Sequence, residues 1–501
     1  MRFKDAAAGK ETVSESRDRR KQLAANIKSI IIPITLQNLI GAAVNAADIV
    51  MLGHLNQASL SSSSLANQVT MILFMFYTGL SSGITIMASQ YWGKKQTRTM
   101  HTLMGMGMRV SLIVSMVFTA LTALIPQYLM MIYTSDPELI RIGAGYLRII
   151  GISFLFTAVS QVYECTIKSM DRAGTAAAFS LAALFVNIVL NAILIFGLLG
   201  APALGITGAA IATVISRAAE LLLCIADSCR NGKKDFTIRP ELLHEWSRTL
   251  QADFKKYSLP ALGNEFLWGA GFSCYTIALG HMGSDIVAAN ALVSSVRELC
   301  SVFVFGAAYG TAILIGNAIG AGEEQRARRD AHDMLFVVLA ASAATGFLIV
   351  FLGPVMLIFT QLTSGAESYV HDMLWINCVY IIGMGMNTTY ICGLFRAGGD
   401  SRYGFVLDTI TMWCIFVPLT FISAFVLHLP PIAVYTLTCS DEFFKLPVNI
   451  THCLKGKWIR TITREETDIH QKNVIYAMSG RVCRSADPLF FVVTVRVFCI
   501  Q

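Results

Sequence analysis

Long apolar stretches follow one another along most of this chain, and they constrain its fold more than any other feature. Twelve of them, each bounded by Gly, Pro or charged residues, are long enough to cross a bilayer core about 30 Å thick, which takes about 20 helical residues. They lie near residues 28–52, 62–91, 101–127, 139–163, 175–198, 205–228, 257–279, 287–317, 333–358, 370–393, 403–427 and 432–454. The last is the weakest, because Asp441, Glu442 and Lys445 interrupt it. The sequence therefore predicts an all-α integral membrane protein with twelve transmembrane helices.

The composition agrees with this fold class. Hydrophobic residues make up 54% of the 501 residues and charged residues 14%, against about 25% charged in a typical soluble domain, and the mean hydropathy is +0.59. Residues 1–28 are polar and basic without an apolar core, so they do not resemble a cleavable signal peptide. The 12 cysteines are scattered singly with no CxxC pair, which indicates small buried side chains rather than a disulfide scaffold.

Positive charges alternate between the connections of the predicted helices. Lys and Arg occur in the N-terminal arm, in 94–98, at Lys168 and Arg172, in 229–256, in 325–329, at Arg396 and Arg402, and from Lys455 onward. The intervening connections contain no Lys or Arg. Because connections rich in Lys and Arg stay on the cytoplasmic side, the alternation predicts that both termini are cytoplasmic.

The chain also repeats itself. A shift of 227 residues superposes identical residues of the two halves. The matches lay Pro33, Gly53, His54, Leu65, Gly79, Gly83, Ile86 and Gly93 on Pro260, Gly280, His281, Leu292, Gly306, Gly310, Ile313 and Gly320. Since the repeat carries six helices, an even number, both halves enter the membrane in the same direction. The sequence therefore predicts two parallel-repeat six-helix lobes around a central cavity.

This organisation predicts five parts of the chain. They are a cytoplasmic N-terminal arm (1–27), an N-lobe with helices 1 to 6 (28–228), a cytoplasmic linker (229–256), a C-lobe with helices 7 to 12 (257–466) and a tail of unknown role (467–501).

Several fragments, in this order and at these spacings, resemble the multidrug and toxic compound extrusion (MATE) family of bacterial type. They include VNAADIVMLGHLNQASLSSSSLANQV, GITIMASQYWGKK, RAGTAAAFSLAALFVNIVLNAILIFGLLG, LPALGNEFLWGAG, GNAIGAGEEQRAR and GLFRAGGDSR. The resemblance covers roughly residues 25 to 465 and leaves the tail outside. It implies an antiporter that exports amphipathic, often cationic, drugs or toxic compounds by alternating access, in exchange for H⁺ or Na⁺.

The resemblance also sets the expected surroundings of the protein. It implies a monomer in the bacterial inner membrane, with the lipid bilayer and small amphipathic substrates as partners, and with no cofactor and no nucleic acid. An alternative function is a flippase for lipids or polysaccharide precursors, which related folds carry out; it would need a cavity lined with Arg and Lys. An enzyme is not expected, because HExxH, GxxxxGK[ST] and nucleophile-elbow motifs are missing.

Asp48 is the first candidate for coupling, because it lies in the outer half of helix 1, five residues before the uncharged loop. A carboxylate at membrane depth costs about 2.5 to 3.5 kcal/mol, so it usually faces a wet cavity and often has a function. Its desolvation would let it hold a proton and release it when the cavity opens; a structural hydrogen bond is the alternative. The resemblance extends to Asn45, Asn187 and Thr213. Asn191 stands where archaeal-type members have a second aspartate, which puts a Na⁺ site in doubt.

Glu265 is the second candidate, five residues after Pro260 in helix 7. Members of the norfloxacin-exporter branch have an essential glutamate that would fall at Trp268, one turn away. Trp268 and Tyr275 share a face of the helix near Glu265, and aromatic rings beside a carboxylate suit an organic cation. We therefore expect Glu265 to attract a cationic substrate or to bind a proton.

Two more residues complete the candidate set of the C-lobe. Helix 10 lacks the aspartate of that branch, and Asn387 is its nearest polar residue, so a complete Na⁺ cage is not expected. Asp408 in helix 11 either has a function or pairs with Arg396, Arg402 or Lys445. No metal site is evident in the sequence, because His54 and His281 have no third ligand nearby.

Overall fold

The computed structural model describes residues 21–22, 24–53, 57–134, 136–231, 247–358 and 363–465. This part of the chain forms helices and connections and contains no strand. Most of the predicted N-terminal arm, residues 232–246 of the predicted linker and the whole tail 467–501 lie outside it. The five-part division therefore stays a prediction, whereas the all-α fold class is confirmed.

Each predicted transmembrane segment corresponds to one helix or to a run of consecutive helices. The first half contains η1 (Ile27–Ile31), α2 (Ile32–Gly53), α3 (Gln57–Gly93), α4 (Thr97–Leu124), α5 (Pro126–Met131), α6 (Pro137–Ile150), α7 (Ser153–Ser169), α8 (Ala173–Phe196), η2 (Leu198–Gly200) and α9 (Ile206–Asn231). The second half contains α10 (Arg248–Gly280), α11 (Ser284–Gly320), α12 (Glu324–Ile358), α13 (Ser364–Thr388), η4 (Thr389–Phe395), α14 (Ser401–Thr409), η5 (Ile410–Phe416), α15 (Val417–Phe425) and α16 (Pro431–Lys455).

Length and hydropathy alone support most of these spans. In the described part, eight helices are long and apolar enough to cross a membrane, or nine if α6 and α7, which meet at 48°, form one bent span. Helix α16 does not qualify, since Asp441, Glu442 and Lys445 fall within it. Its charged residues therefore need partners inside the protein.

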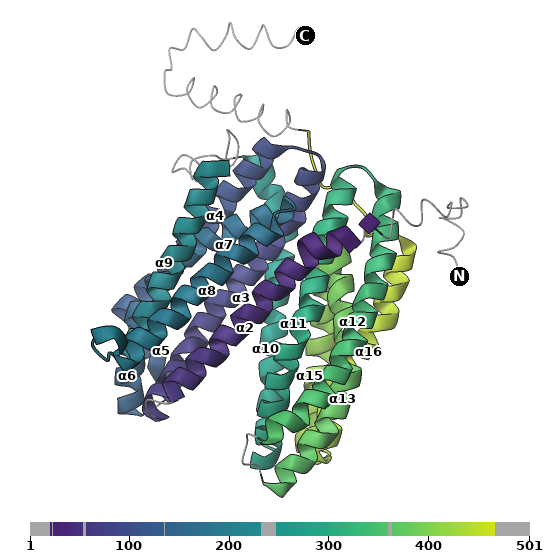
Figure 1. The fold of residues 1–501 in the computed structure, drawn as a ribbon. Helices are drawn as coiled ribbons and strands as arrows, with labels where there is room; N and C mark the ends of the chain where they lie inside the picture. The colour runs from purple at the N-terminus through teal and green to yellow at the C-terminus, as the bar shows by residue number, and fades with distance from the viewer. Residues whose placement is uncertain are drawn as a thin grey trace, which may run out of the picture.

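The helices form two bundles that lie side by side (Figure 1). In chain order the N-lobe comprises η1 to α9 and the C-lobe comprises α10 to α16. The beginning of the N-lobe, η1 and the first turn of α2, reaches over to the C-lobe, where Ile30, Ile31 and Ile34 join its core. Within the N-lobe, α8 packs on α9 and α4 on α7; within the C-lobe, α11 packs on α12 and α12 on α13. Helices α3, α10 and α11, together with α2, make the contacts between the lobes.

The internal repeat is visible in the bounds of the helices. Helix α3 runs from Gln57 to Gly93 and α11 from Ser284 to Gly320, so both ends differ by the 227 residues of the sequence repeat. Helices α4 and α12 begin at Thr97 and Glu324 with the same offset. The parallel two-lobe arrangement predicted from the sequence is therefore present in the structure.

The repeated glycines lie where the lobes touch. A Cβ at Gly79 would lie 2.7 Å from the Cα of Leu262, and one at Gly306 would lie 2.9 Å from the Cα of Thr35. The four contacts of this kind are Gly79 with Leu262, Gly83 with Ser258, Gly306 with Thr35 and Gly310 with Ile31. The 227-residue shift relates the contacts of Gly306 and Gly310 to those of Gly79 and Gly83, because it relates both the glycines and the residues that they face. Small residues thus let α3 approach α10, and α11 approach η1 and α2, in the same way.

Two further glycines bring α3 and α11 together near their last turns. A Cβ at Gly93 would meet the backbone of Asn317 and Ala321, and a Cβ at Gly320 would meet the backbone of Gln90. This is the basic end of the molecule, which we define by the connections 94–96, 170–172, 321–323 and 396–400. Toward the other, charge-poor end, defined by 197–205, 281–283 and 426–430, the ribbons of the two bundles diverge (Figure 1).

Residues 456–465 run across the basic end and contact both lobes. The Nε2 of Gln90 in α3 donates to the carbonyls of Ala397 and Arg460, at 2.7 and 3.1 Å, and its Oε1 accepts from the backbone N–H of Ile462 at 2.9 Å. The Arg464 guanidinium donates to both carboxylate oxygens of Asp253 in α10, and this interaction raises the pKa of Arg464. The segment therefore adds polar contacts to the apolar contact between the lobes.

We expect Gly320→Ala to destabilise the protein. Its Cβ would meet the Gln90 backbone, which cannot rotate away as a side chain can, and overpacking of this kind costs about 1 to 3 kcal/mol. Unfolding in mixed micelles with increasing sodium dodecyl sulfate measures the loss. Gly145→Ala in α6 is the matched control, because a Cβ there has no neighbour within 4 Å and alanine favours a helix. Equal stability of the two variants would contradict the close contact.

Candidate functional site

Three of the predicted N-lobe residues lie together. Asn187 and Asn191 are one turn apart on α8, so they share a face of the helix. The Nδ2 of Asn191 donates to the Oδ1 of Asn187 at 3.1 Å, and the Nδ2 of Asn187 donates to the Oγ1 of Thr213 in α9 at 3.4 Å. Both asparagines are buried. The structure therefore forms a polar cluster between α8 and α9 at the predicted place.

Asn45 and Asp48 lie in α2, but their side chains are outside the part of the chain that the structure describes. Helix α2 packs along α8. Met51, one turn after Asp48, packs with the buried residues Ile195 of α8 and Ala209 of α9. The roles predicted for Asn45 and Asp48 stay predictions.

A second polar network lies between α2, α7, α8 and α9. The Nε2 of Gln37 donates to Glu164 at 2.9 Å and to the Oγ of Ser180 at 2.5 Å, and Ser180 lies 3.3 Å from both Glu164 and Glu220. Each carboxylate has its own cation. Lys168 lies 3.8 Å from Glu164, and Arg217 lies 2.8 Å from Glu220. Two negative and two positive charges balance here, which agrees with a structural role.

Glu265 forms a buried ion pair at the contact between the lobes. The Nη1 of Arg396, which follows η4, donates to the Oε1 of Glu265 in α10 at 2.8 Å and to the Oγ of Ser82 in α3 at 2.8 Å. The side chains of Arg396 and Glu265 are 2% and 16% exposed. The predicted acid is therefore not open to an organic cation in this conformation, because it is already neutralised by an arginine that also binds the N-lobe.

The predicted aromatic residues of α10 belong to one cluster. The rings of Trp268 and Phe272 have centroids 4.5 Å apart, and those of Phe272 and Tyr275 are 6.0 Å apart with their planes nearly perpendicular. Met412 and Phe416 of η5 pack against Tyr275. Trp268 and Tyr275 thus lie on one side of α10, toward α14, η5 and α15.

Asp408 takes part in a charged cluster whose other members come from α16. Its Oδ1 lies 3.3 Å from the Nζ of Lys445. The same ammonium lies 3.7 Å from Asp441 and 3.0 Å from Glu442. We call Asp408, Asp441, Glu442 and Lys445 the Lys445 cluster. Of the three partners that the sequence left open for Asp408, the structure selects Lys445.

Amide side chains surround the Lys445 cluster. The Nδ2 of Asn264 in α10 donates to Asp408 at 2.9 Å. The Nδ2 of Asn387 in α13 donates to the Oε2 of Glu442 at 2.8 Å and also to the Glu442 carbonyl, and its Oδ1 accepts from the Nδ2 of Asn449 at 2.8 Å. The predicted residues Asn387 and Asp408 therefore belong to one polar region. The ion pair of Glu265 and Arg396 is separate from it.

The sequence interpretation names Lys445 only as one of three partners for Asp408 and places neither Asp441 nor Glu442 in a site, because charged residues lower the hydropathy of the last span. A signal was nevertheless present. Asp441 and Lys445 are four residues apart and Glu442 and Lys445 three, which places all three on one face of a helix as ion pairs. Charged residues inside a span usually face the protein interior.

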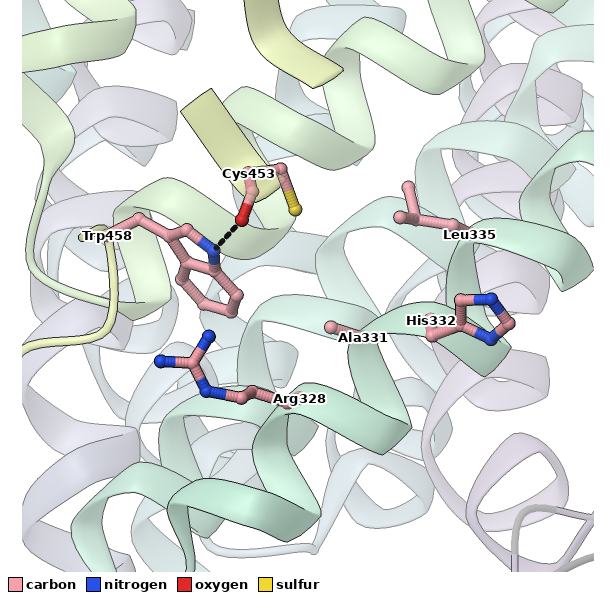
Figure 2. Close-up of a pocket in the computed structure, with 6 residues that line it drawn as sticks. All are labelled: Arg328, Ala331, His332, Leu335, Cys453 and Trp458. Carbon is pink, nitrogen blue, oxygen red and sulfur yellow. Dashed lines mark hydrogen bonds between the residues drawn. The ribbon is translucent and has the colours of Figure 1, made fainter. Parts of the chain in front are cut away.

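A small pocket lies beside Trp458 at the basic end, between α12 and the segment after α16 (Figure 2). Its lining residues are Arg328, Ala331, His332, Leu335, Cys453 and Trp458. Its volume of about 10 Å³ is enough for about one water molecule. The indole Nε1 of Trp458 donates to the Cys453 carbonyl at 3.2 Å. This pocket is too small for an organic ligand. It is a gap beside the Trp458 indole, which the hydrogen bond to Cys453 holds in place.

Within the described residues, no group of three or more His, Cys, Asp or Glu side chains could hold a metal ion.

Two repeated helical lobes, with charged side chains buried among membrane-spanning helices, define a multi-pass membrane transporter. The chain belongs to the MatE family: the family's sequence profile matches residues 33–193 and 260–422, one segment in each lobe.

Individual members show the same relationship. The chain is 22% identical to the uncharacterized transporter YisQ of Bacillus subtilis, over 83% of this chain and 91% of YisQ. It is 22% identical to the probable multidrug resistance protein NorM of Thermotoga maritima, over 91% of this chain and 96% of NorM. A solved outward-facing structure of a multidrug resistance MATE family transporter has a TM-score of 0.77 at 17% identity, over 86% of this chain and 95% of that chain. The structural likeness confirms the fold.

We expect Arg396→Met to lower the free energy of unfolding by about 3 to 5 kcal/mol, because it leaves the buried Glu265 carboxylate without its partner. The double variant Glu265→Gln and Arg396→Met should recover most of this loss, since no unpaired charge remains. Unfolding titrations with sodium dodecyl sulfate measure both. If the double variant is no more stable than Arg396→Met, the two side chains do not form an ion pair.

Proposed function

We propose that this protein is an antiporter of the bacterial inner membrane that exports small amphipathic, often cationic compounds in exchange for H⁺ or Na⁺. In this proposal both termini are cytoplasmic, the basic end faces the cytoplasm and the protein acts as a monomer. The observation that carries it is the one-sided contact between the lobes. The glycine contacts join them near the basic end, and the bundles diverge toward the charge-poor end.

The one-sided contact between the lobes supports alternating access as the transport mechanism. Two repeated lobes that meet near one end would transport by separating there and meeting near the other. The ion pair of Glu265 and Arg396 would have to break in this change, because Arg396 binds Ser82 of the opposite lobe at the contact. Protonation of Glu265, or competition by a cation, would weaken the pair. Glu265 would thus link cation binding to the separation of the lobes.

The substrate class is supported by the relatives, several of which are named as probable multidrug resistance proteins. The buried charges favour the same class over the flippase alternative. A pyrophosphate group needs free Arg or Lys side chains, but Arg396 and Lys445 are each paired with carboxylates. In the Lys445 cluster three carboxylates face one ammonium, which favours cationic cargo.

A disulfide between the lobes would test alternating access. The Cβ of Ile31 would lie 3.6 Å from a Cβ built at Gly310, within the range of about 3.5 to 4.5 Å that disulfides adopt. We expect the double variant Ile31→Cys and Gly310→Cys to lose ethidium export when oxidised and to regain it on reduction. The single variants, treated identically, are the controls. Full export by the cross-linked protein would show that the lobes need not separate at this end.

The coupling ion is tested in proteoliposomes that contain ethidium and carry an imposed H⁺ or Na⁺ gradient. We expect one of the gradients to drive transport, and Asp48→Asn or Glu265→Gln to reduce it at least tenfold, because each removes a carboxylate that would bind the coupling ion. Glu138→Gln, which changes an exposed acid in the first turn of α6, is the control. If neither gradient moves a cationic dye, the export function is wrong and lipid flipping becomes the function to measure.

A further inference from the structure

The Lys445 cluster has an excess of negative charge. Three carboxylates, those of Asp408, Asp441 and Glu442, face the single ammonium of Lys445 at 3.3, 3.7 and 3.0 Å. If all four groups are ionised, the net charge is −2. By contrast, Glu265 and Arg396 balance one to one.

Burial makes this excess costly. The side chains of Lys445, Asp441 and Glu442 are only 3 to 4% exposed, and that of Asp408 is 13% exposed. Removing an uncompensated charge from water costs several kcal/mol per ion even after relaxation. A neutralising ligand is therefore needed in this place, and it must be a cation.

Other charged groups near the cluster do not supply the missing positive charge. Arg396 is held by Glu265. Among the described residues, Arg297 of α11 forms no ion pair with a carboxylate of the cluster; it donates to Asn377 and Ser294 and lies over the rings of Phe272 and Tyr380. Among the described residues, the other titratable groups that face the cluster or adjoin it are Tyr275, Tyr380, Tyr435, Cys392 and Cys439, none of which carries a positive charge.

Within the part of the chain that the structure describes, three buried oxygen atoms beside the cluster have no hydrogen-bond partner. Asn264 is 6% exposed, and its Oδ1 is unpartnered although its Nδ2 donates to Asp408. Tyr275 is 5% exposed, lies within electrostatic range of Asp441, Glu442 and Lys445, and has a hydroxyl that is also unpartnered. The Oδ1 of Asn449, whose Nδ2 donates to Asn387, is a third. The two amide oxygens can only accept and the tyrosine hydroxyl can accept as well as donate, so a protonated carboxyl group in the cluster would supply a donor that such atoms lack.

We propose that the Lys445 cluster is a proton-binding site of the C-lobe, distinct from Glu265, in which protons on the carboxyl groups of Asp408, Asp441 and Glu442 neutralise the charge that Lys445 leaves uncompensated. A metal ion does not serve this purpose, because the described carboxylates do not converge on one point. Two carboxyls that share a site cannot both stay ionised when the charge is uncompensated. The ammonium of Lys445 is a fixed counter-ion that sets how many protons are held.

A role in exchange follows if the proposed function holds, and this second step rests on it. Asp408 is the most exposed carboxylate of the cluster and lies on α14, away from the other two on α16. An organic monocation that reaches Asp408 would replace a proton there, and the proton would leave for the solvent. Charge is conserved in this step, because one positive charge enters as one leaves.

Infrared difference spectroscopy tests the proton site without transport. The full-length protein in lipid nanodiscs is titrated with acid and base while the C=O stretch of protonated carboxyl groups is recorded. We expect this band in the wild type near neutral pH, and expect it to weaken in Asp408→Asn, Asp441→Asn or Glu442→Gln. Asp253→Asn removes a carboxylate that Arg464 balances, so it should leave the band unchanged.

Lys445→Met should change the intensity of the band in the opposite direction to the carboxyl variants. A variant that strengthens the band shows that the weakening in the other variants is not a general effect of misfolding. Removal of the only ammonium should strengthen the protonated-carboxyl band, because a further carboxyl must be neutralised. The proposal is overturned if the wild type shows no such band at any pH at which it is folded. It is equally overturned if the band is insensitive to all three carboxyl variants, or if Lys445→Met weakens it.

Release of protons tests the exchange step. Tetraphenylphosphonium is added to the protein in weakly buffered solution with a pH indicator, and we expect acidification that is at least halved in Asp408→Asn but not in Asp253→Asn. Binding without acidification would refute the exchange step while the infrared result decides the proton site. Absence of binding would instead count against the export function and therefore also against proton exchange at Asp408.

Discussion

The close approach of the two lobes through small residues is the constraint on which the rest of the structure depends. Gly79 and Gly83 let α3 approach α10, and the equivalent Gly306 and Gly310 let α11 approach η1 and α2. At Gly79 and Gly306 a Cβ would meet the backbone of the facing helix, so a larger residue there would separate the helices and weaken the contacts between the lobes. Among these contacts is the ion pair of Glu265 with Arg396, which also reaches Ser82 across the same interface.

Buried charge is the second organising interaction, and it differs between the lobes. In the described N-lobe, Glu164 and Glu220 each lie near their own cation. In the C-lobe, one ammonium faces three carboxylates. A balanced network holds helices together without a ligand, whereas an unbalanced one needs a cation or a proton. The two lobes thus share a backbone arrangement through the repeat, whereas the balance of their buried charges differs.

The length of the apolar stretches predicted nearly all of the membrane-spanning helices. The weakest predicted span, the last one, contains most of the Lys445 cluster. Asp441, Glu442 and Lys445 make the last span the weakest by hydropathy, yet α16 is a full helix of 25 residues that contains them. Hydropathy treats each residue as if it faced lipid. Residues that face a partner in the protein violate that assumption, so the score falls where buried charges gather.

Candidate residues were located less completely than helices. The resemblance to the MATE family singled out Asn187, Asn191 and Thr213, and the structure brings these three together between α8 and α9. It could not choose between Arg396, Arg402 and Lys445 as the partner of Asp408, nor foresee that Arg396 pairs with Glu265. These pairings join residues 37 and 131 positions apart. No local spacing encodes them.

The sequence by itself determined the all-helical membrane fold, the positions of the spans and the duplication, because each follows from local hydropathy or from identity between the halves. Only the tertiary structure decided which charges neutralise each other and which remain in excess. The physical reason is that the free energy of a buried charge depends on groups within a few ångströms in space. Those groups come from helices distant along the chain, and packing alone brings them together.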